Sequence, residues 1–278
     1  MNARLLFILL LFTIGALWYI IGYWRRKAGE AAFAAARLTE KSEERERYCR
    51  LAVMAGHRKA CRMFCLLHPE RFDGHSPHKP FKLRGIRISF YGYYYPSRYN
   101  ALLNDEQKAF CHSIYQFKQG DIHGIEFFKT CMNALQLKKR PYHIMFMPCS
   151  NWIKYGQRFK RLDWYIGKHR QDLTSGLYDV DICDARESLH EAKGGEKRIL
   201  ERNYLITGKI KGKEISIIEG VLTTGEIVGD DKEEIERCGG KVVAAIFYGK
   251  TLSMPSMLLV QIHVWGNHIA HIIERMTK

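Results

Sequence analysis

Two threonines and a glycine follow an apolar run in the C-terminal half of the chain. Thr223, Thr224 and Gly225 come shortly after Glu219, an acidic residue that ends an isoleucine-rich run at 215–218 typical of a buried strand. At a turn from a strand into a helix, hydroxyls and backbone N–H groups can bind an anion, because the helix dipole favours negative charge. Glycine lets such a ligand approach closely. The pattern predicts a phosphate-binding turn, and the alternative is an ordinary turn whose threonines cap the next helix.

The elements expected around this turn alternate between strand and helix. A charged helix is expected at 229–237, with Gly239 and Gly240 as its C-terminal stop, and a strand follows at 242–247. Upstream, 101–117 is typical of a helix and 142–147 of a strand. The 278 residues leave room for one α/β domain and its attachments.

These elements and the turn together resemble the phosphoribosyl-pyrophosphate motif of type I phosphoribosyltransferases. The run that continues to Leu252 is similar to the ComF-type branch of that family, which is linked to competence proteins. In the family, a hydrophobic strand ends in two acidic residues before a Thr-Thr-Gly loop. Here Glu219 occupies the first acidic position and Gly220 the second. The resemblance implies a parallel sheet flanked by helices.

Four further segments carry the resemblance, which spans about residues 117–252. The segment 117–121 is similar to the start of the ComF-type catalytic domain, and Pro148, Cys149 and Ser150 occupy the turn that holds pyrophosphate in the family. Arg158 lies in a basic helix at the position of a family Arg-containing run, and a solvated helix face is the alternative. A polar segment, 186–203, ends in Arg202 and Asn203; in the family such a segment folds over the donor.

The resemblance implies a glycosyl transfer from phosphoribosyl pyrophosphate with Mg²⁺ as cofactor. The 5′-phosphate would bind at Thr223, Thr224 and Gly225, and Glu219 would act as the catalytic acidic residue toward the ribose hydroxyls. Mg²⁺ prefers oxygen ligands and phosphates, so no metal site made by the protein is expected. Gly220 removes one acidic partner, and Glu226 places a carboxylate beside the phosphate. A catalytically degenerate fold is therefore the alternative, acting as a nucleotide sensor, a nucleic-acid-binding module or an assembly module at the membrane.

Charge and aromatic residues leave a nucleic-acid partner open. The formal net charge of +15 favours an anionic partner, which is a phosphate ligand, a nucleic acid or an acidic lipid surface. A strand pair is expected at 85–95, and its tyrosines offer stacking for bases, although packing on a sheet is the commoner use of such residues. These tyrosines are Tyr91, Tyr93, Tyr94 and Tyr95. The eight cysteines form no paired framework, which favours reduced and mostly buried thiols.

The chain begins with a segment typical of a membrane anchor. Residues 5–24 contain no charged side chain and are long enough to span a bilayer as a helix. Trp18 and Trp24 lie toward the end of this segment, as in an interfacial aromatic belt, and Arg25, Arg26 and Lys27 follow at once. By the positive-inside rule, we expect a single-pass protein whose C-terminal domain is cytoplasmic. A cleaved signal peptide is the alternative.

Three domains are expected from these features. Residues 1–27 form the anchor and its basic flank, 28–84 a helical hairpin and linker, and 85–278 the phosphoribosyltransferase-like domain. The hairpin weakly resembles half of a helical-repeat unit, but no second copy is visible. Histidines and cysteines of this region match no standard zinc spacing. At the C-terminus, 257–264 favours a strand and 268–276 a short helix.

Overall fold

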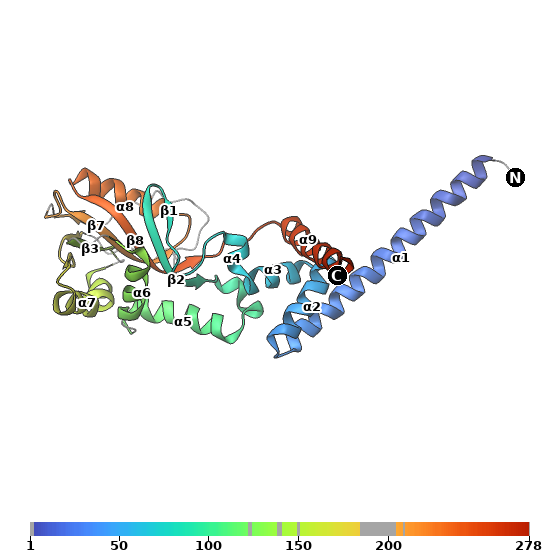
Figure 1. Ribbon diagram of the computed structural model, residues 1–278, viewed down its shortest axis with the longest axis horizontal. Coiled ribbons are helices and arrows are strands. Elements are labelled where there is room, and N and C mark those ends of the chain that lie inside the picture. The colour runs from blue at the N-terminus through green and yellow to red at the C-terminus, as the bar shows by residue number, and fades with distance from the viewer. Residues whose placement is uncertain are drawn as a thin grey trace. The chain divides into compact units, whose positions relative to one another are not determined.

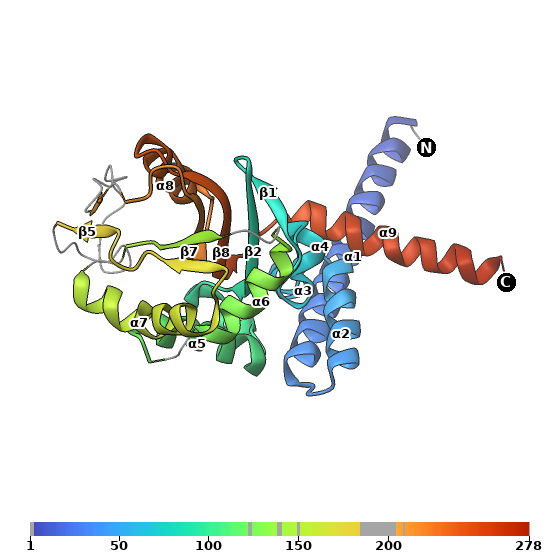
Figure 2. The same cartoon turned by 60° about the vertical axis from the view of Figure 1, so that its left-hand side comes forward.

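The computed structural model describes residues 3–121, 124–137, 141–148, 151–183, 204–207 and 209–277, and only the backbone of residues 3–6 and 8. Its residues form two compact units (Figures 1 and 2). The helical unit comprises Met1–Gly74, Ala101–Leu103 and Ser253–Lys278, and the sheet unit comprises His75–Asn100 and Asn104–Leu252. The C-terminal segment that the sequence grouped with the sheet therefore belongs with the N-terminal helices.

Helices and strands are labelled as in Figure 1. The helices are α1 (Ala3–Leu38), α2 (Ser42–Met54), α3 (Arg58–Leu67), α4 (Pro69–Asp73), α5 (Asp105–Gln119), α6 (Ile125–Leu135), α7 (Trp152–His169), α8 (Glu226–Arg237) and α9 (Met257–Met276), with a 3-10 helix at Ser97–Leu102. The strands are β1 (Phe81–Leu83), β2 (Ile86–Tyr94), β3 (Tyr142–Phe146), β4 (Leu173–Ser175), β5 (Val180–Ile182), β6 (Tyr204–Ile206), β7 (Glu214–Leu222) and β8 (Lys241–Thr251).

Where the structure describes it, the sheet unit is built on six strands in the order β1-β2-β8-β7-β3-β4. All neighbouring pairs from β2 to β4 are parallel, and only β1 pairs antiparallel, with β2. Strands β5 and β6 form a separate two-stranded antiparallel sheet. Helices α5, α6 and α7 cover one face of the sheet and α8 the other (Figure 1). This arrangement confirms the expected α/β fold with a mostly parallel sheet flanked by helices.

The core of the sheet unit is rich in aromatic side chains. Phe117 of α5, Phe128 of α6 and Phe159 of α7 are fully buried against Phe146 of β3. Each such side chain contributes about 1.5–3 kcal/mol by leaving water. Strands β7 and β8 are covered on both faces, which explains their nearly continuous apolar sequences.

The tyrosines in β2, and Tyr95 directly after it, are packing residues. Tyr93 and Tyr95 are each 5% exposed. The hydroxyls of Tyr94 and Tyr115 share a hydrogen bond of 3.1 Å. Tyr91 packs edge-on against Tyr248 with ring centroids 5.8 Å apart. The interpretation as packing residues is confirmed, and the expected strand pair at 85–95 is instead a single strand that pairs with β1 and β8.

The helical unit has its own core between α1, α2, α3 and α9. Phe33 of α1, Ala52 of α2, Phe64 of α3 and Val264 of α9 are buried in it. α9 is one helix across the region where a strand and a short helix were predicted. That strand prediction was wrong because the β-branched Val260 and Val264 recur at helical spacing and pack on one side.

α1 continues as one helix past residue 27, where a boundary between domains was expected. Among the residues that the structure describes, no helix reaches the length and hydropathy needed to cross a membrane. Five of the seven described cysteines are buried and all seven are unpaired, which confirms the interpretation as mostly buried thiols; the buried ones are Cys49, Cys61, Cys65, Cys111 and Cys131.

Candidate functional site

The Thr-Thr-Gly turn lies at the carboxyl end of β7, a central strand of the sheet. Thr223 and Thr224 are exposed, and Gly225 is the residue before α8. The Oγ1 of Thr224 accepts a long hydrogen bond of 3.4 Å from the backbone N–H of Glu226. The turn therefore offers exposed hydroxyls at a helix N-terminus, and Thr224 also makes a weak contact of the capping kind.

Gly225 is required by the backbone of this turn. Its φ of +79° lies in the left-handed region, which L side chains rarely adopt. A Cβ at this position would also lie 2.4 Å from Cδ2 of Leu83, which comes from β1. The β1–β2 hairpin thus packs directly on the glycine while the two threonines stay exposed.

Glu219 lies three residues before the end of β7 and is half-buried. Burial raises the pKa of Glu219 from its ordinary value of 4.5 to about 8, and the charge of Asp231 adds to this rise, while Lys118 and Arg158 act in the opposite direction. At pH 7 the carboxyl group is therefore mostly protonated. In that form it can donate a hydrogen bond to a ligand, whereas the role implied by the resemblance needs a carboxylate that accepts one.

Lys118 and Arg158 bring two positive charges to the same end of the sheet. Nη2 of Arg158 donates a hydrogen bond of 3.0 Å to the backbone carbonyl of Lys118. The guanidinium lies 5.8 Å from the ring centroid of Phe117 and 5.6 Å from that of Phe159. Within the described residues, Nε of Arg158 is buried without a hydrogen-bond partner. An uncompensated buried donor of this kind is costly unless a ligand or water accepts from it.

Gly220 is the position where the resemblance expects a second acidic residue. A Cβ added there would lie 3.5 Å from Cε of Lys118, an ordinary contact. The backbone therefore has room for a side chain at 220, pointing toward a cation. With no acid at 220, the charged side chains that act on the neighbouring Glu219 are Asp231, Lys118 and Arg158.

Asp231 and Tyr204 extend the cluster on the α8 side of the sheet. The hydroxyl of Tyr204 donates a hydrogen bond of 2.5 Å to Oδ1 of Asp231, which is only 6% exposed. The contact joins β6 to α8. Sequence reasoning missed both residues, because acidic residues are common in the first turns of helices and nothing local marks this one as buried.

The remaining predicted residues divide between the sheet edge and the undescribed segments. Pro148 lies two residues after the end of β3, and the backbone N–H of Met147 between them donates to the carbonyl of Ile218 at 2.9 Å. Parallel strands end at the same edge, so Pro148 lies at the edge that carries Glu219 and the Thr-Thr-Gly turn. The other four predicted residues lie outside the described residues: Cys149, Ser150, Arg202 and Asn203.

The residues at this edge do not fit a magnesium ion held by the protein. Mg²⁺ needs ionised oxygen ligands in near-octahedral geometry. The described charged groups that interact here are two acids, Glu219 and Asp231, and two cations, Lys118 and Arg158. In the described part of the chain, no group of three or more histidine, cysteine or acidic side chains is arranged to hold a metal ion.

A second buried polar cluster lies at the amino end of β3. The ring of His143 bonds through Nε2 to Asp179 and through Nδ1 to the hydroxyl of Thr174 at 2.7 Å. Burial lowers the pKa of His143. A Cβ on Gly176 would lie 2.6 Å from Nε2 of His143. Because this end of the sheet is opposite the turn, and the histidine is enclosed, the cluster fixes the loop after β4.

Comparison with models of known protein families gave no match, and comparison with curated proteins gave none either. The chemistry of the site follows from its own geometry. Exposed hydroxyls, backbone N–H groups, a neutral carboxyl group and two cations meet at one edge of the sheet. Together they can bind an anionic ligand that carries hydroxyl groups.

Proposed function

We propose that the sheet unit binds phosphoribosyl pyrophosphate or a related nucleotide at the carboxyl end of β7. The observation that carries this proposal is that Arg158 bonds to the backbone of Lys118 and that the charges of both residues act on Glu219, in the strand that leads to the Thr-Thr-Gly turn. In open parallel sheets, ligands bind outside the carboxyl ends of the strands. The resemblance to type I phosphoribosyltransferases points to the same edge.

The ligand would be held at two points. Its 5′-phosphate would accept hydrogen bonds from the hydroxyls of Thr223 and Thr224 and from the backbone at the start of α8. Its second anionic group would pair with Arg158, whose buried Nε then gains an acceptor, and with Lys118. Glu219, protonated, would donate to a ribose hydroxyl between them.

Binding is favoured over transfer of the phosphoribosyl group. In that transfer, positive charge develops on the ribose ring as pyrophosphate leaves, and a nearby carboxylate would stabilise it. The neutral Glu219 and the side-chain-free Gly220 supply no such negative charge. We therefore favour a binding protein, a nucleotide sensor in its simplest form, and treat transfer as the second candidate. Any Mg²⁺ would arrive with the phosphates of the ligand.

The first experiment is calorimetric titration of phosphoribosyl pyrophosphate into the full chain in detergent micelles. Wild type should bind, and the double variant Thr223→Ala, Thr224→Ala should lose most of the affinity. Thr130→Ala, a threonine of α6, serves as the matched control and should bind as wild type does. If wild type shows no binding in the millimolar range, the proposed site is rejected. Release of pyrophosphate in the presence of an acceptor base would instead favour transfer.

We also propose that the N-terminal helix attaches the chain to a membrane with the sheet unit on the cytoplasmic side. The support is the uncharged run at 5–24 and the basic triplet Arg25, Arg26 and Lys27 that follows it. Flotation of the full chain with phosphatidylcholine vesicles tests this attachment. Protein that stays at the bottom of the gradient would rule it out.

A further inference from the structure

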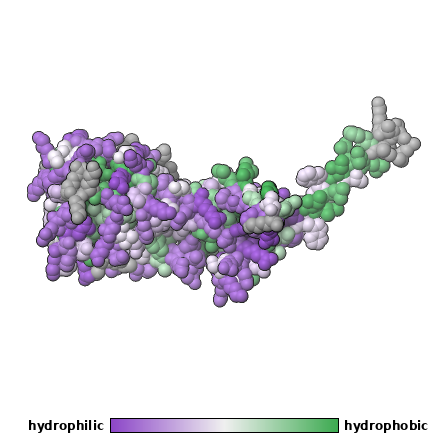
Figure 3. Space-filling view, in the orientation of Figure 1, coloured by the Kyte–Doolittle hydropathy of each residue, from purple (hydrophilic) through white to green (hydrophobic). Residues whose placement is uncertain are grey.

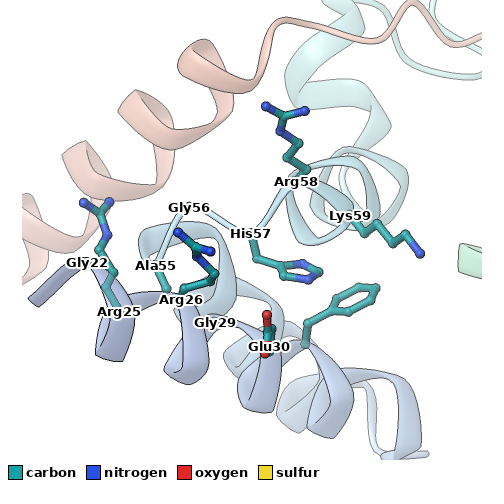
Figure 4. A pocket seen from close by; sticks show the side chains of 11 residues that line it. Gly22, Arg25, Arg26, Gly29, Glu30, Ala55, Gly56, His57, Arg58 and Lys59 are labelled. Atoms are coloured by element: carbon teal, nitrogen blue, oxygen red, sulfur yellow. The ribbon is translucent and has the colours of Figure 1, made fainter. Parts of the chain in front are cut away.

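A pocket in the helical unit lies where α1 passes the turn between α2 and α3 (Figure 4). Its volume is about 960 Å³. Four basic side chains line it against one acidic side chain, Glu30; the basic residues are Arg25, Arg26, Arg58 and Lys59. The pocket is therefore strongly positive, although its residues come from segments about thirty positions apart in the sequence.

Small residues and a structural histidine shape this pocket. A Cβ on Gly29 would lie 3.1 Å from Cβ of Ala55, so α1 passes very close to the end of α2. Nδ1 of His57 accepts a hydrogen bond of 3.2 Å from the N–H of Ala60, and its ring stacks on Phe33 with centroids 4.4 Å apart. Burial lowers the pKa of His57, which agrees with its role as an acceptor. His57 thus builds the wall, and the arginines and the lysine supply the charge.

Two of the arginines, Arg25 and Arg26, lie where an apolar stretch of α1 ends. Phe12, Trp18 and Trp24 of α1 are 75%, 73% and 66% exposed. Figure 3 shows hydrophobic colour along this part of the helix. A helix that is apolar on all sides needs apolar surroundings. The pocket begins at Gly22 and Arg25, where this apolar stretch ends.

α9 adds a second exposed apolar surface beside the pocket. Its exposed apolar residues recur every three or four positions and form one stripe, opposite the face that packs on α2 and α3; they are Leu258, Leu259, Ile262, Trp265, Ile269, Ile272, Ile273 and Met276. Nε2 of Gln261 donates to the carbonyl of Val53 at 3.4 Å. A Cβ on Gly56 would lie 3.4 Å from the same Nε2 and 3.9 Å from Nη2 of Arg25. Side chains of both α9 and α1 therefore lie near the turn between α2 and α3 that contains Gly56.

We propose that this pocket binds the phosphate of an anionic phospholipid in the membrane to which α1 and the stripe of α9 attach. Guanidinium groups bind phosphate oxygens in pairs, and the boundary between apolar and basic residues on α1 is where a headgroup would lie. A negatively charged lipid also matches the excess of basic over acidic side chains. The inference rests on the membrane attachment proposed above, and adds a preference for one class of lipid.

The test uses the full chain in detergent micelles, titrated separately with short-chain phosphatidylglycerol, short-chain phosphatidylcholine and inorganic phosphate, with binding followed by native mass spectrometry. The double variant Arg26→Gln, Arg58→Gln keeps Arg25, whose Nη2 donates to the carbonyl of Met54 at 3.0 Å and supports the fold. Arg47→Gln, an exposed arginine of α2 outside the pocket, is the matched control. Thermal unfolding checks that both variants fold as wild type does.

Wild type should prefer phosphatidylglycerol to phosphatidylcholine by about 25-fold, and the double variant should lose that preference, since it removes two basic residues and each one near an anionic surface is worth about fivefold. The control should keep it. Equal binding of both lipids, or an unchanged preference in the double variant, would overturn the proposal. So would inorganic phosphate that displaces the lipid at equal concentration, because the site would then serve a soluble anion. Flotation with phosphatidylcholine vesicles reports the attachment separately.

Discussion

Nη2 of Arg158 donates a hydrogen bond of 3.0 Å to the backbone carbonyl of Lys118. This bond joins the middle of α7 to the end of α5 and holds both cations near Glu219. It also leaves the buried Nε of Arg158 available, among the described residues, for a ligand oxygen. The proposed binding function therefore depends on this pair of helices as well as on the threonine turn.

Replacement of Arg158 should therefore weaken ligand binding strongly. We expect Arg158→Gln to reduce the affinity for phosphoribosyl pyrophosphate by about ten- to a hundredfold, the size of a lost hydrogen bond to a charged group. Calorimetric titration measures the change. Lys160→Gln, which removes an exposed charge from the same helix, should change the affinity little. Equal losses in the two variants would mean that only the overall charge of α7 matters.

The pKa of Glu219 predicts how stability depends on pH. With a pKa of about 8 in the folded chain and 4.5 in the unfolded chain, the folded chain holds a proton that the unfolded chain releases. The free energy of unfolding should fall as the pH rises through this interval and level off above it. Chemical unfolding of wild type and Glu219→Gln across the interval measures the effect. The variant should show a flatter curve, and identical slopes would contradict the raised pKa.

An acidic residue at position 220 should make ligand binding depend on magnesium. We expect removal of Mg²⁺ by a chelator to change the affinity of wild type little, because its residues do not fit a protein-held ion. In Gly220→Asp, a carboxylate would be introduced where the backbone has room for it. Chelation should then reduce the affinity for the ligand by about tenfold, the value of one charged hydrogen bond. Gly220→Asn is the uncharged control, and a chelator effect of the same size in it would refute the argument.

Gly225→Ala should destabilise the sheet unit. The left-handed φ and the short contact with Leu83 should together cost about 2–4 kcal/mol. Urea unfolding of four proteins closes the cycle: wild type, Gly225→Ala, Leu83→Ala and the double variant. Because Leu83→Ala relieves the contact and not the backbone strain, the double variant should recover only part of the loss. If the losses of unfolding free energy in the two single variants simply add in the double variant, Leu83 does not contact the side chain introduced at position 225.

Local patterns were enough to predict several elements of the sheet unit. The isoleucines before Glu219 mark β7, and the basic run with its apolar spacing marks α7, because both signals lie within a few residues. The meeting of Lys118 with Arg158, forty positions apart, depends on how α5 and α7 pack on one face. No local pattern carries that information.

The protonation of Glu219 was unpredictable for the same reason. Its neighbours Lys118, Arg158 and Asp231 come from three different helices, and their balance sets the pKa. At the C-terminus, 257–264 has the β-branched content of a strand, yet the spacing of Val260 and Val264 belongs to a helix whose partners α2 and α3 lie two hundred residues earlier. Composition favoured a strand at 257–264, and tertiary packing selected a helix.

α1 runs without a break from Ala3 to Leu38, so the orientation of its apolar stretch around the helix axis is fixed relative to that of its pocket residues. A helix turns by about 100° and advances about 1.5 Å with each residue. One alanine inserted after Lys27 would swing Arg25 and Arg26 by that angle relative to Gly29 while leaving the amino-acid composition almost unchanged. The uninterrupted helix therefore fixes both the angle around its axis and the position along it at which Arg25 and Arg26 reach the turn between α2 and α3.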